Sequence, residues 1–487
     1  MQRSEKTLFG FGLILYLLVA WNNEGYHHLD EHFQIIEFAN YKLGNIPASD
    51  SPWELGKKIR PSLQPILAMA WIRIANNLAI NVFDQMFFLR VLSAVLCLWL
   101  YWLLCKQLAG DFEQEIFGRR LLFRLSVFLW YMPYISVRFS SETWSALSLL
   151  AGTLILLQIK RKEITSTAVQ LGLSGFLMGL AFLFRFQIAF AVIGVGAWLL
   201  FEKRIQWQQL AAWIFGGLSA VAIGFALDCW FYESTVFTPW LYYKVNIQEG
   251  VAREFGVSPW WYYVPEYLIK AIPPLSVALL LLLIAGIRHK PRHIFTWMLL
   301  PFLLVHTIVG HKEIRFLFPM AFPALFLMVQ GWDAWHLKIQ DWKAYKYLRN
   351  FLVGINLVIL LIICLLPAHK VVGTYHFFHH YVKETGPVRL YTLDKGPFYY
   401  QNLRFSYYEL PDLTVRPVAQ WKDLRDSSAF LLRKGDLIFN QNLQLPPELE
   451  NLPLRRVYTG FPNWILQFNV NNWQARTPMW TVFRMER

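Results

Sequence analysis

Eleven long apolar segments constrain the fold of this chain more than any other feature of the sequence. Hydrophobic residues make up 56% of its 487 residues and charged residues only 16%, whereas an average soluble domain is about 25% charged. A helix needs about 20 apolar residues to cross a bilayer, with a range of roughly 17 to 25. The candidate spans are 7–21, 87–104, 121–138, 143–159, 167–183, 187–201, 208–227, 267–287, 294–309, 316–333 and 350–367. The pattern predicts a polytopic α-helical membrane protein with about 11 transmembrane helices.

Basic residues occur in short clusters between the apolar segments. If the N-terminus, with Arg3 and Lys6, lies inside, the alternation of spans places every such cluster on the inner side. The clusters are Lys106/Arg119/Arg120, Lys160/Arg161/Lys162, Lys203/Arg204, Arg288/Lys290/Arg292 and Lys338/Lys343/Lys346/Arg349. Cytoplasmic loops are enriched in Lys and Arg, so this distribution supports the span count and the orientation. The net charge of +14 therefore reflects membrane orientation, and we expect no nucleic-acid partner.

Residues 61–80 are apolar but are interrupted by Arg73, Asn76 and Asn77. Counting this stretch as a span would invert all later segments and place the basic clusters outside. We therefore expect a helix that lies at the outer interface.

The C-terminal segment 368–487 differs in composition, with six of its prolines at positions 411, 417, 446, 447, 453 and 462 and with charges of both signs. Short apolar runs at 388–393, 436–439 and 464–468 are typical of strands. We expect a soluble α/β or mainly β domain over 368–487 on the extracytoplasmic side. The transmembrane domain would cover 1–367 and would include a long outer loop, 22–86.

The first outer loop begins with the sequence His27-His28-Leu29-Asp30-Glu31-His32. A carboxylate at the membrane surface can act as a general base toward a hydroxyl group. A solvated polar cap on a helix is one alternative. A metal site is another, because His28 and His32 are four residues apart and share one helical face, although no third ligand is evident nearby.

A second polar cluster, His311-Lys312-Glu313-Ile314-Arg315, separates two apolar segments. Ionisable groups at the edge of a membrane are costly and often functional. Lys312 and Arg315 can bind a phosphate, Arg315 through its planar fork. The alternative is a cap of long side chains that reach back to the interface, but these cations lie outside, against the general charge trend.

Further polar or aromatic residues fall on the same predicted face of the membrane. They are Glu142, Arg185, Asp228, Tyr232, Asn246 and Trp260. Each alone is more often a helix-end residue or, for the aromatics, part of the interfacial belt. We treat them as candidate substrate-binding residues because they share one face with the two carboxylates.

Taken together, these motifs resemble the GT-C glycosyltransferases. They are most similar to the mannosyltransferases that build GPI anchors and lumenal N-glycan precursors from dolichyl-phosphate mannose. The matching segments, in order, are Leu29-Asp30-Glu31-His32-Phe33-Gln34; Trp53-Glu54 with Ile59-Arg60-Pro61-Ser62; Asp228 to Trp260, including Tyr232 and Asn246; and His311-Lys312-Glu313-Ile314-Arg315-Phe316. The Pro61 between Arg60 and Ser62 departs from the family pattern.

The resemblance implies an inverting transfer of a sugar, mannose by analogy, from a polyprenyl-phosphate donor to a glycan or glycolipid acceptor. It implies that Asp30 is the general base, that Glu31 helps to bind the acceptor, and that His311, Lys312 and Arg315 hold the donor phosphate. Glu54 and Arg60 join the candidate substrate-binding residues. No cofactor and no metal is expected.

Two other classes remain open from the residues alone. A lipid-linked-sugar flippase or transporter would also carry outer charges, but it would place ionisable groups deep in several spans. The second is a structural membrane subunit.

The tight loops favour a bacterial inner membrane with a periplasmic active site, with the ER membrane and a lumenal active site as the alternative.

Overall fold

The computed structural model describes residues 3–161, 168–339, 341–400, 403–426 and 432–487. The chain divides into two compact units. The helical unit comprises residues 1–23 and 53–366, and the sheet unit comprises 24–52 and 367–487. Residues 24–52, which carry Asp30 and Glu31, thus group with the C-terminal segment, whereas 53–86 group with the helices.

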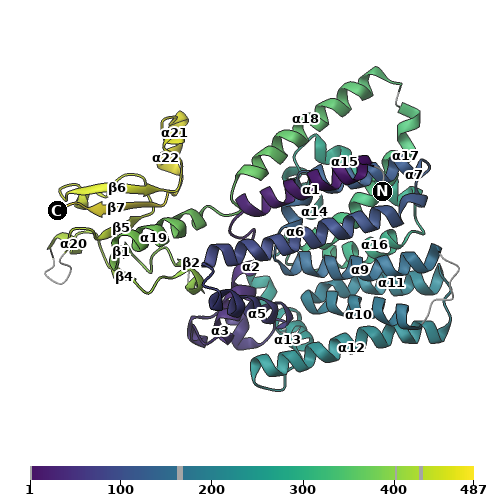
Figure 1. The fold of residues 1–487 in the computed structure, drawn as a ribbon, viewed down its shortest axis with the longest axis horizontal. Helices are drawn as coiled ribbons and strands as arrows, with labels where there is room; N and C mark the ends of the chain where they lie inside the picture. Colours follow the sequence, from purple (N-terminus) through teal and green to yellow (C-terminus); the bar gives the residue numbers. More distant parts are fainter. Residues whose placement is uncertain (1–2, 162–167, 340, 401–402, 427–431) are drawn as a thin grey trace. The chain divides into compact units, whose positions relative to one another are not determined.

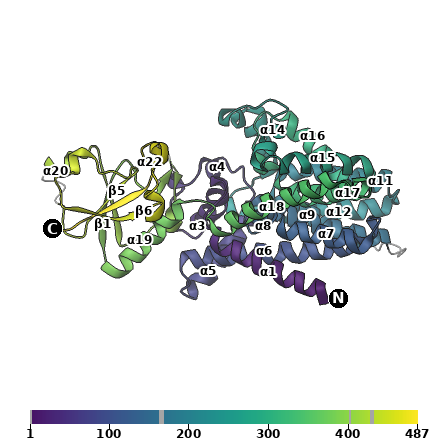
Figure 2. The ribbon, with the colours of Figure 1, turned by 90° about the horizontal axis from the view of Figure 1, so that it is seen from above.

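The helical unit contains a helix at every apolar segment. Figure 1 shows α6, α9, α10 and α12 running side by side, and Figure 2 gives the view from above. Its α-helices are α1 (Arg3–Asn22), α4 (Trp53–Lys57), α5 (Leu63–Asn77), α6 (Val82–Gln107), α7 (Glu115–Phe128), α8 (Tyr131–Ser136), α9 (Ser141–Arg161), α10 (Ala168–Phe184), α11 (Ala189–Phe201), α12 (Trp207–Tyr232), α13 (Thr238–Tyr243), α14 (Tyr263–Lys270), α15 (Leu275–His289), α16 (Ile294–Ile308), α17 (Ala321–Ile339) and α18 (Lys343–Leu365). Residue 167, the expected start of the fifth span, and Lys162 of the second basic cluster lie outside the described residues.

The lengths of these helices vary. Within the described part of the chain, five helices are long and apolar enough to cross a membrane: Val82–Gln107, Ser141–Ile159, Trp207–Tyr232, Ile314–His336 and Lys343–Leu365. Four shorter apolar helices are Ala168–Phe184, Phe186–Phe201, Leu275–His289 and Ile294–Ile308. Two expected spans are interrupted. The span 121–138 divides into α7 and α8. The span 267–287 divides at Pro273-Pro274, because proline lacks the amide hydrogen that continues a helix. The fold is that of a polytopic helical membrane protein.

Residues 61–80 form a separate helix, α5, that packs against α6, α10 and α12. Only one side of α5 is buried, through residues such as Ala68, Ile72 and Ala75, while Arg73 is exposed. Spacings of three and four residues between the buried positions are typical of an amphipathic helix.

The sheet unit contains a five-stranded sheet with the order β4-β1-β5-β7-β6. Strand β1 (Val388–Leu393) is parallel to β4 (Leu413–Val418) and β5 (Leu437–Asn440), whereas β7 (Thr481–Met485) is antiparallel to β5 and β6 (Leu454–Thr459). The pair β2 (Tyr399–Tyr400) and β3 (Leu403–Arg404) forms a small second sheet. The expected strands at 388–393 and 436–439 correspond to β1 and β5.

The expected strand at 464–468 is wrong, because this segment contains the short helix α21 (Asn463–Leu466). Pro462 is the N-cap of this helix, with extended backbone at φ −57 and ψ 141, as is typical of the residue that precedes a helix. The remaining helices of the unit are α2 (Leu29–Glu31), α3 (Phe38–Lys42), α19 (Val371–Thr385), α20 (Asp423–Asp426) and α22 (Trp473–Arg476). Buried side chains from three strands, Tyr391, Ile438 and Phe483, form the core of the sheet.

Candidate functional site

The segment from His311 to Arg315 is extended at its centre and then enters the 3-10 helix η7 (Ile314–Met320). Glu313 is extended, with φ −138 and ψ 143, whereas Ile314 and Arg315 already belong to η7. His311 and Arg315 both contact Glu313. The Nε2 atom of His311 is 2.9 Å from one Glu313 carboxylate oxygen, and Arg315 Nε donates to the other at 2.5 Å.

The second ring nitrogen of His311, Nδ1, lies 3.2 Å from the carbonyl oxygen of Gly256. A histidine with an oxygen acceptor at each ring nitrogen donates from both only as the imidazolium cation. The hydrogen bond to Glu313 is the main reason that the pKa of His311 is raised above its ordinary value. His311 therefore adds positive charge to this site when both of its ring nitrogens are protonated.

Arg315 is bound by a second carboxylate, that of Glu142 at the start of α9. Arg315 Nη1 donates to Glu142 Oε1 at 3.2 Å, and Arg185 Nη1 donates to the same oxygen at 2.8 Å. All three side chains are buried, with exposed fractions of 3 to 6%. Both guanidinium groups also lie near the ring of Phe316, at 4.9 and 5.2 Å from its centre. The structure thus brings Glu142, Arg185 and Arg315 together at the ends of three different helical segments.

Lys312 makes its contacts away from this cluster. Its ammonium donates to the carbonyl oxygens of Ser258, at 2.9 Å, and of Val309. Burial lowers the pKa of Lys312 below its ordinary value. In this structure Lys312 therefore joins the loop around residue 258 to the end of α16.

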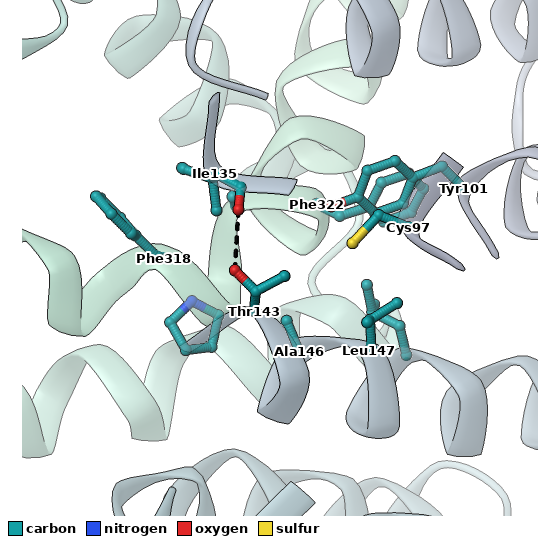
Figure 3. Close-up of a pocket in the computed structure, with 11 residues that line it drawn as sticks. Cys97, Tyr101, Ile135, Thr143, Ala146, Leu147, Phe318 and Phe322 are labelled. Carbon is teal, nitrogen blue, oxygen red and sulfur yellow. Dashed lines mark hydrogen bonds between the residues drawn. The ribbon is translucent and has the colours of Figure 1, made fainter. Parts of the chain in front are cut away.

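Below the charged cluster lies a small apolar cavity of about 10 Å³, with space for about one water molecule. Its lining includes Thr143, next to Glu142, together with Phe318, Phe322, Cys97 and Tyr101 (Figure 3). The Thr143 hydroxyl donates to the Ile135 carbonyl oxygen at 2.9 Å, so even this polar group is satisfied internally. Apolar surroundings of this kind strengthen the electrostatic interactions of the adjoining cluster.

Arg60 connects Glu54, near the start of the second stretch of the helical unit, to the segment around Arg185. Its guanidinium is 3.6 Å from Glu54 and lies over the ring of Tyr242, 5.6 Å from the ring centre. Tyr242 in turn accepts a hydrogen bond from Gln187 at 2.6 Å, two residues after Arg185. Glu54 and Arg60 are therefore connected by direct contacts to the segment that carries Arg185.

Asp228 and Tyr232, at the end of α12, bind the segment around Arg60 and Ser62. Asp228 accepts hydrogen bonds from the Ser62 amide at 2.8 Å, the Ser62 hydroxyl at 2.6 Å and the Thr238 hydroxyl at 2.5 Å. Tyr232 donates to the Arg60 carbonyl oxygen at 2.7 Å. These contacts fix the backbone on both sides of Pro61 and thereby orient the Arg60 side chain.

Asn246 meets this network only at the backbone of Tyr242, and Trp260 lies at the surface. The Asn246 amide donates to the Tyr242 carbonyl oxygen at 3.1 Å within one helical turn. Trp260 is 73% exposed. Exposed indole rings at the end of a helical membrane bundle are typical of the interfacial belt.

Asp30 and Glu31 belong to the sheet unit, on the single turn of α2. Asp30 is partly exposed, at 26%, and its carboxylate is 3.5 Å from His28 Nδ1. The Glu31 carboxylate accepts a hydrogen bond from the His27 amide at 3.1 Å. The turn is thus closed by its own side chains, and the Asp30 carboxylate stays accessible.

His32, which shares a helical spacing with His28, turns inward instead. Its Nε2 atom is 2.8 Å from the carboxylate of Glu37, and both side chains are buried. Among the described residues, no group of three or more His, Cys, Asp or Glu side chains is placed to share a metal ion.

Two carboxylates with many contacts, Glu313 and Glu37, were not assigned a role from the sequence. Glu313 could have been found, because it lies in the same polar cluster, two residues from both His311 and Arg315. Glu37 gives no comparable signal, since its hydrogen-bond partners other than His32 and Asn40 are residues 406 and 407, far along the chain.

Comparison with known proteins identifies the family. The model of the Alg9-like mannosyltransferase family matches residues 7–394. GPI mannosyltransferase 3 of Candida albicans is 23% identical over 333 residues, which cover 68% of this chain and 64% of that protein. A probable Dol-P-Man:Man(7)GlcNAc(2)-PP-Dol alpha-1,6-mannosyltransferase of Schizosaccharomyces pombe is 30% identical over 134 residues, which cover 27% of this chain and 24% of that protein. The matched segments thus span less than two thirds of the length of either relative.

A solved structure shares the fold. The crystal structure of ArnT from Cupriavidus metallidurans bound to undecaprenyl phosphate superposes with a TM-score of 0.54 at 12% identity, covering 99% of this chain and 98% of that one. The resemblance stated from the motifs is confirmed. The chain belongs to the Alg9-like mannosyltransferase family and has a GT-C fold.

Proposed function

We propose that this chain is an inverting mannosyltransferase. It moves mannose from a polyprenyl-phosphate donor to a hydroxyl group of a glycan or glycolipid acceptor on the extracytoplasmic face of the membrane. The observation that carries the proposal is the buried cluster of Glu142, Arg185 and Arg315, with His311 joined to it through Glu313. Family membership supports it.

The chemistry needs positive charge at the leaving group. A departing phosphate is stabilised by charge and by hydrogen-bond donors, and it does not need to receive a proton. In our proposal His311 and Arg315 hold the donor phosphate, and its oxygens replace the Glu313 carboxylate on the fork of Arg315. Lys312 joins them when its ammonium exchanges a carbonyl oxygen for a phosphate oxygen.

The acceptor hydroxyl needs a base. Asp30 takes its proton, and Glu31 helps to bind the acceptor. Glu54, Arg60, Arg185, Asp228, Tyr232, Asn246 and Trp260 are proposed to bind or surround the substrates. Of these, Asp228 and Tyr232 act through the backbone that they hold around Arg60.

The test is turnover with a synthetic polyprenyl-phosphate mannose and the purified protein in lipid. We expect wild-type transfer with inversion at the anomeric carbon. Asp30→Asn should lower kcat by about 10² to 10⁴, the usual range for general base catalysis. The matched control is Asp412→Asn, an exposed aspartate of the same unit, which should retain full activity. Full activity of Asp30→Asn would contradict the assignment of the base.

We expect the reaction to need no metal. EDTA should therefore leave wild-type turnover unchanged. If EDTA stopped the enzyme and Mg²⁺ or Mn²⁺ restored it, the phosphate would be held by a metal, and Asp30 and Glu31 would be reassigned as its ligands.

The transporter alternative is not favoured. Arg90, a charge within an apolar helix, donates to the Ala20 carbonyl oxygen at 2.7 Å, so it is bound to the backbone of α1.

We propose an integral membrane enzyme of the bacterial inner membrane with a periplasmic site, on the basis of the short loops. The ER membrane is the alternative, which the two yeast relatives favour. Fractionation of native membranes separates the two.

A further inference from the structure

Glu37 is a fully buried carboxylate in the sheet unit that the proposed chemistry does not use. It lies seven residues after Asp30, and its exposed fraction is 0%. One of its oxygens is 2.8 Å from His32 Nε2 and accepts from the Tyr407 amide at 3.0 Å. The other accepts from the Asn40 amide at 3.3 Å and from the Ser406 hydroxyl. These contacts use the acceptor capacity of a carboxylate in full.

The backbone around Glu37 is a π-helix, His32–Glu37, placed directly after the turn that carries Asp30 and Glu31. Five residues correspond to about 1.4 turns of an α-helix, which would direct His32 and Glu37 to different sides. The wider π turn brings residues five apart onto one face, and such turns are frequent at functional sites. The contact between His32 and Glu37 therefore depends on the π-helix, and it stabilises the π-helix in turn.

The partners of this π-helix come from the C-terminal segment, in the turn at residues 405–408. The His32 ring stacks on Tyr408 with centres 5.4 Å apart, and the Phe33 ring lies 4.6 Å from Phe405. The Asn40 amide also donates to the Ser406 hydroxyl at 3.1 Å. Residues 405–408 thus hold the π-helix from one side by rings, by side-chain hydrogen bonds and by a backbone amide.

We propose that the turn at residues 405–408 and the buried Glu37–His32 pair form a positioning device for Asp30 and Glu31. The C-terminal segment would then contribute to catalysis although Glu37 and Ser406 touch no substrate. The inference rests on the proposed function, because it takes Asp30 as the base. Helical backbone is stiff, so the direction of the π-helix sets the direction of the turn before it. A misplacement of about 1 Å can cost on the order of 10² in rate.

The experiment compares Glu37→Gln, which keeps the shape of the side chain, with Ser406→Ala and Ser406→Thr. We expect kcat per folded enzyme to fall about 10- to 100-fold for Glu37→Gln and Ser406→Ala, with the KM for the donor changed less than about twofold. Ser406→Thr retains the hydroxyl and should restore most of the activity. Asp436→Asn is the matched control: it removes a buried carboxylate from the same unit, where it binds Arg389 at 2.9 Å, and it should leave kcat unchanged.

A double variant separates positioning from loss of fold. If Glu37 acts through Asp30, Glu37→Gln should not lower the residual rate of Asp30→Asn further, because residues that act as one unit are not additive. Equal losses in both backgrounds, or normal kcat in Glu37→Gln, would overturn the proposal.

Amide hydrogen exchange tests the device without the reaction. In Glu37→Gln, exchange should become faster at residues 28–38 and stay unchanged in β1 and β5. Unchanged exchange at 28–38, or a uniform increase across the sheet, would also contradict the inference. If wild-type protein transferred no mannose, the proposed function would fail, whereas this measurement would still decide whether residues 405–408 hold the Asp30 turn.

Discussion

At the scale of single residues, Arg315 is the best-defined member of the site. Its Nε and Nη2 atoms donate to Glu313 and its Nη1 atom donates to Glu142. A lysine ammonium is a single point of charge on a flexible stem and cannot reproduce this planar arrangement.

Arg315→Lys should therefore impair the enzyme although the charge is kept. Loss of a charge-assisted contact costs about 1.5–3 kcal/mol, which corresponds to roughly tenfold to hundredfold in kcat/KM. The measurement varies the donor at saturating acceptor. Arg253→Lys, at an exposed position of the same unit, should behave as wild type. A defect that appeared only when the acceptor was varied would argue against a role at the donor phosphate.

His311 predicts a pH dependence. Its hydrogen bond to Glu313 raises its pKa, so folded protein keeps this proton at pH values where the unfolded chain has lost it. The stabilising contribution is complete below the ordinary pKa of about 6.5 and is lost as the pH rises through the raised value.

Because the cation faces the donor phosphate in our proposal, the KM for the donor should increase over the same pH range. Donor KM measured at a series of pH values shows this directly, and His311→Gln should flatten the curve. An unchanged slope in His311→Gln would assign the titration to another group.

At the scale of elements, the crossing of α10 and α12 depends on glycine. A Cβ atom on Gly216 would overlap the Gly172 carbonyl oxygen, and one on Gly175 would overlap the Trp213 carbonyl oxygen. Small residues allow helix backbones to approach closely in a membrane. The approach also holds the end of α12, where Asp228 fixes the segment around Ser62.

Gly216→Ala should therefore lower the thermal stability of the helical unit. Gly354→Ala in α18 is the matched control, because a Cβ there meets no atom within 4 Å; alanine generally favours helix by about 1 kcal/mol over glycine. Thermal unfolding in detergent compares the two variants. Equal melting temperatures for Gly216→Ala and wild type would show that the helices can separate without cost.

At the scale of the whole molecule, orientation follows from the charges. The basic clusters lie between alternate apolar segments, which predicts that the N-terminus is inside and the C-terminal segment is outside. Reporter fusions after Lys290 and at the C-terminus should report opposite sides of the membrane. The same side for both would contradict the eleven-span arrangement.

The sequence by itself determined the helical segments and the family. Each apolar segment is helical because its character is set by neighbouring residues, and a run of apolar side chains with satisfied backbone is stable in a bilayer only as a helix or a closed barrel. The motifs around Asp30 and Arg315 are also local, so they could be recognised without a structure. The break at Pro273-Pro274 has a local signal, because proline lacks the amide hydrogen that continues a helix, whereas residues 129–130, between α7 and α8, include no proline.

Only the tertiary structure decided which side chains meet. Arg315 lies 173 positions from Glu142, and Ser406 lies 369 positions from Glu37. Neither contact can therefore be predicted from a spacing in the sequence. Lys312 is a third case: its ammonium binds the carbonyl oxygens of Ser258 and Val309, whereas its neighbours His311 and Arg315 contact Glu313. Residues 24–52 likewise pack with the C-terminal segment because Glu37 and its neighbours find their hydrogen-bond and ring partners there. The spacing of apolar residues along the chain reflects local conformational preference. Contacts between distant segments arise instead from packing and from the need to satisfy buried polar groups.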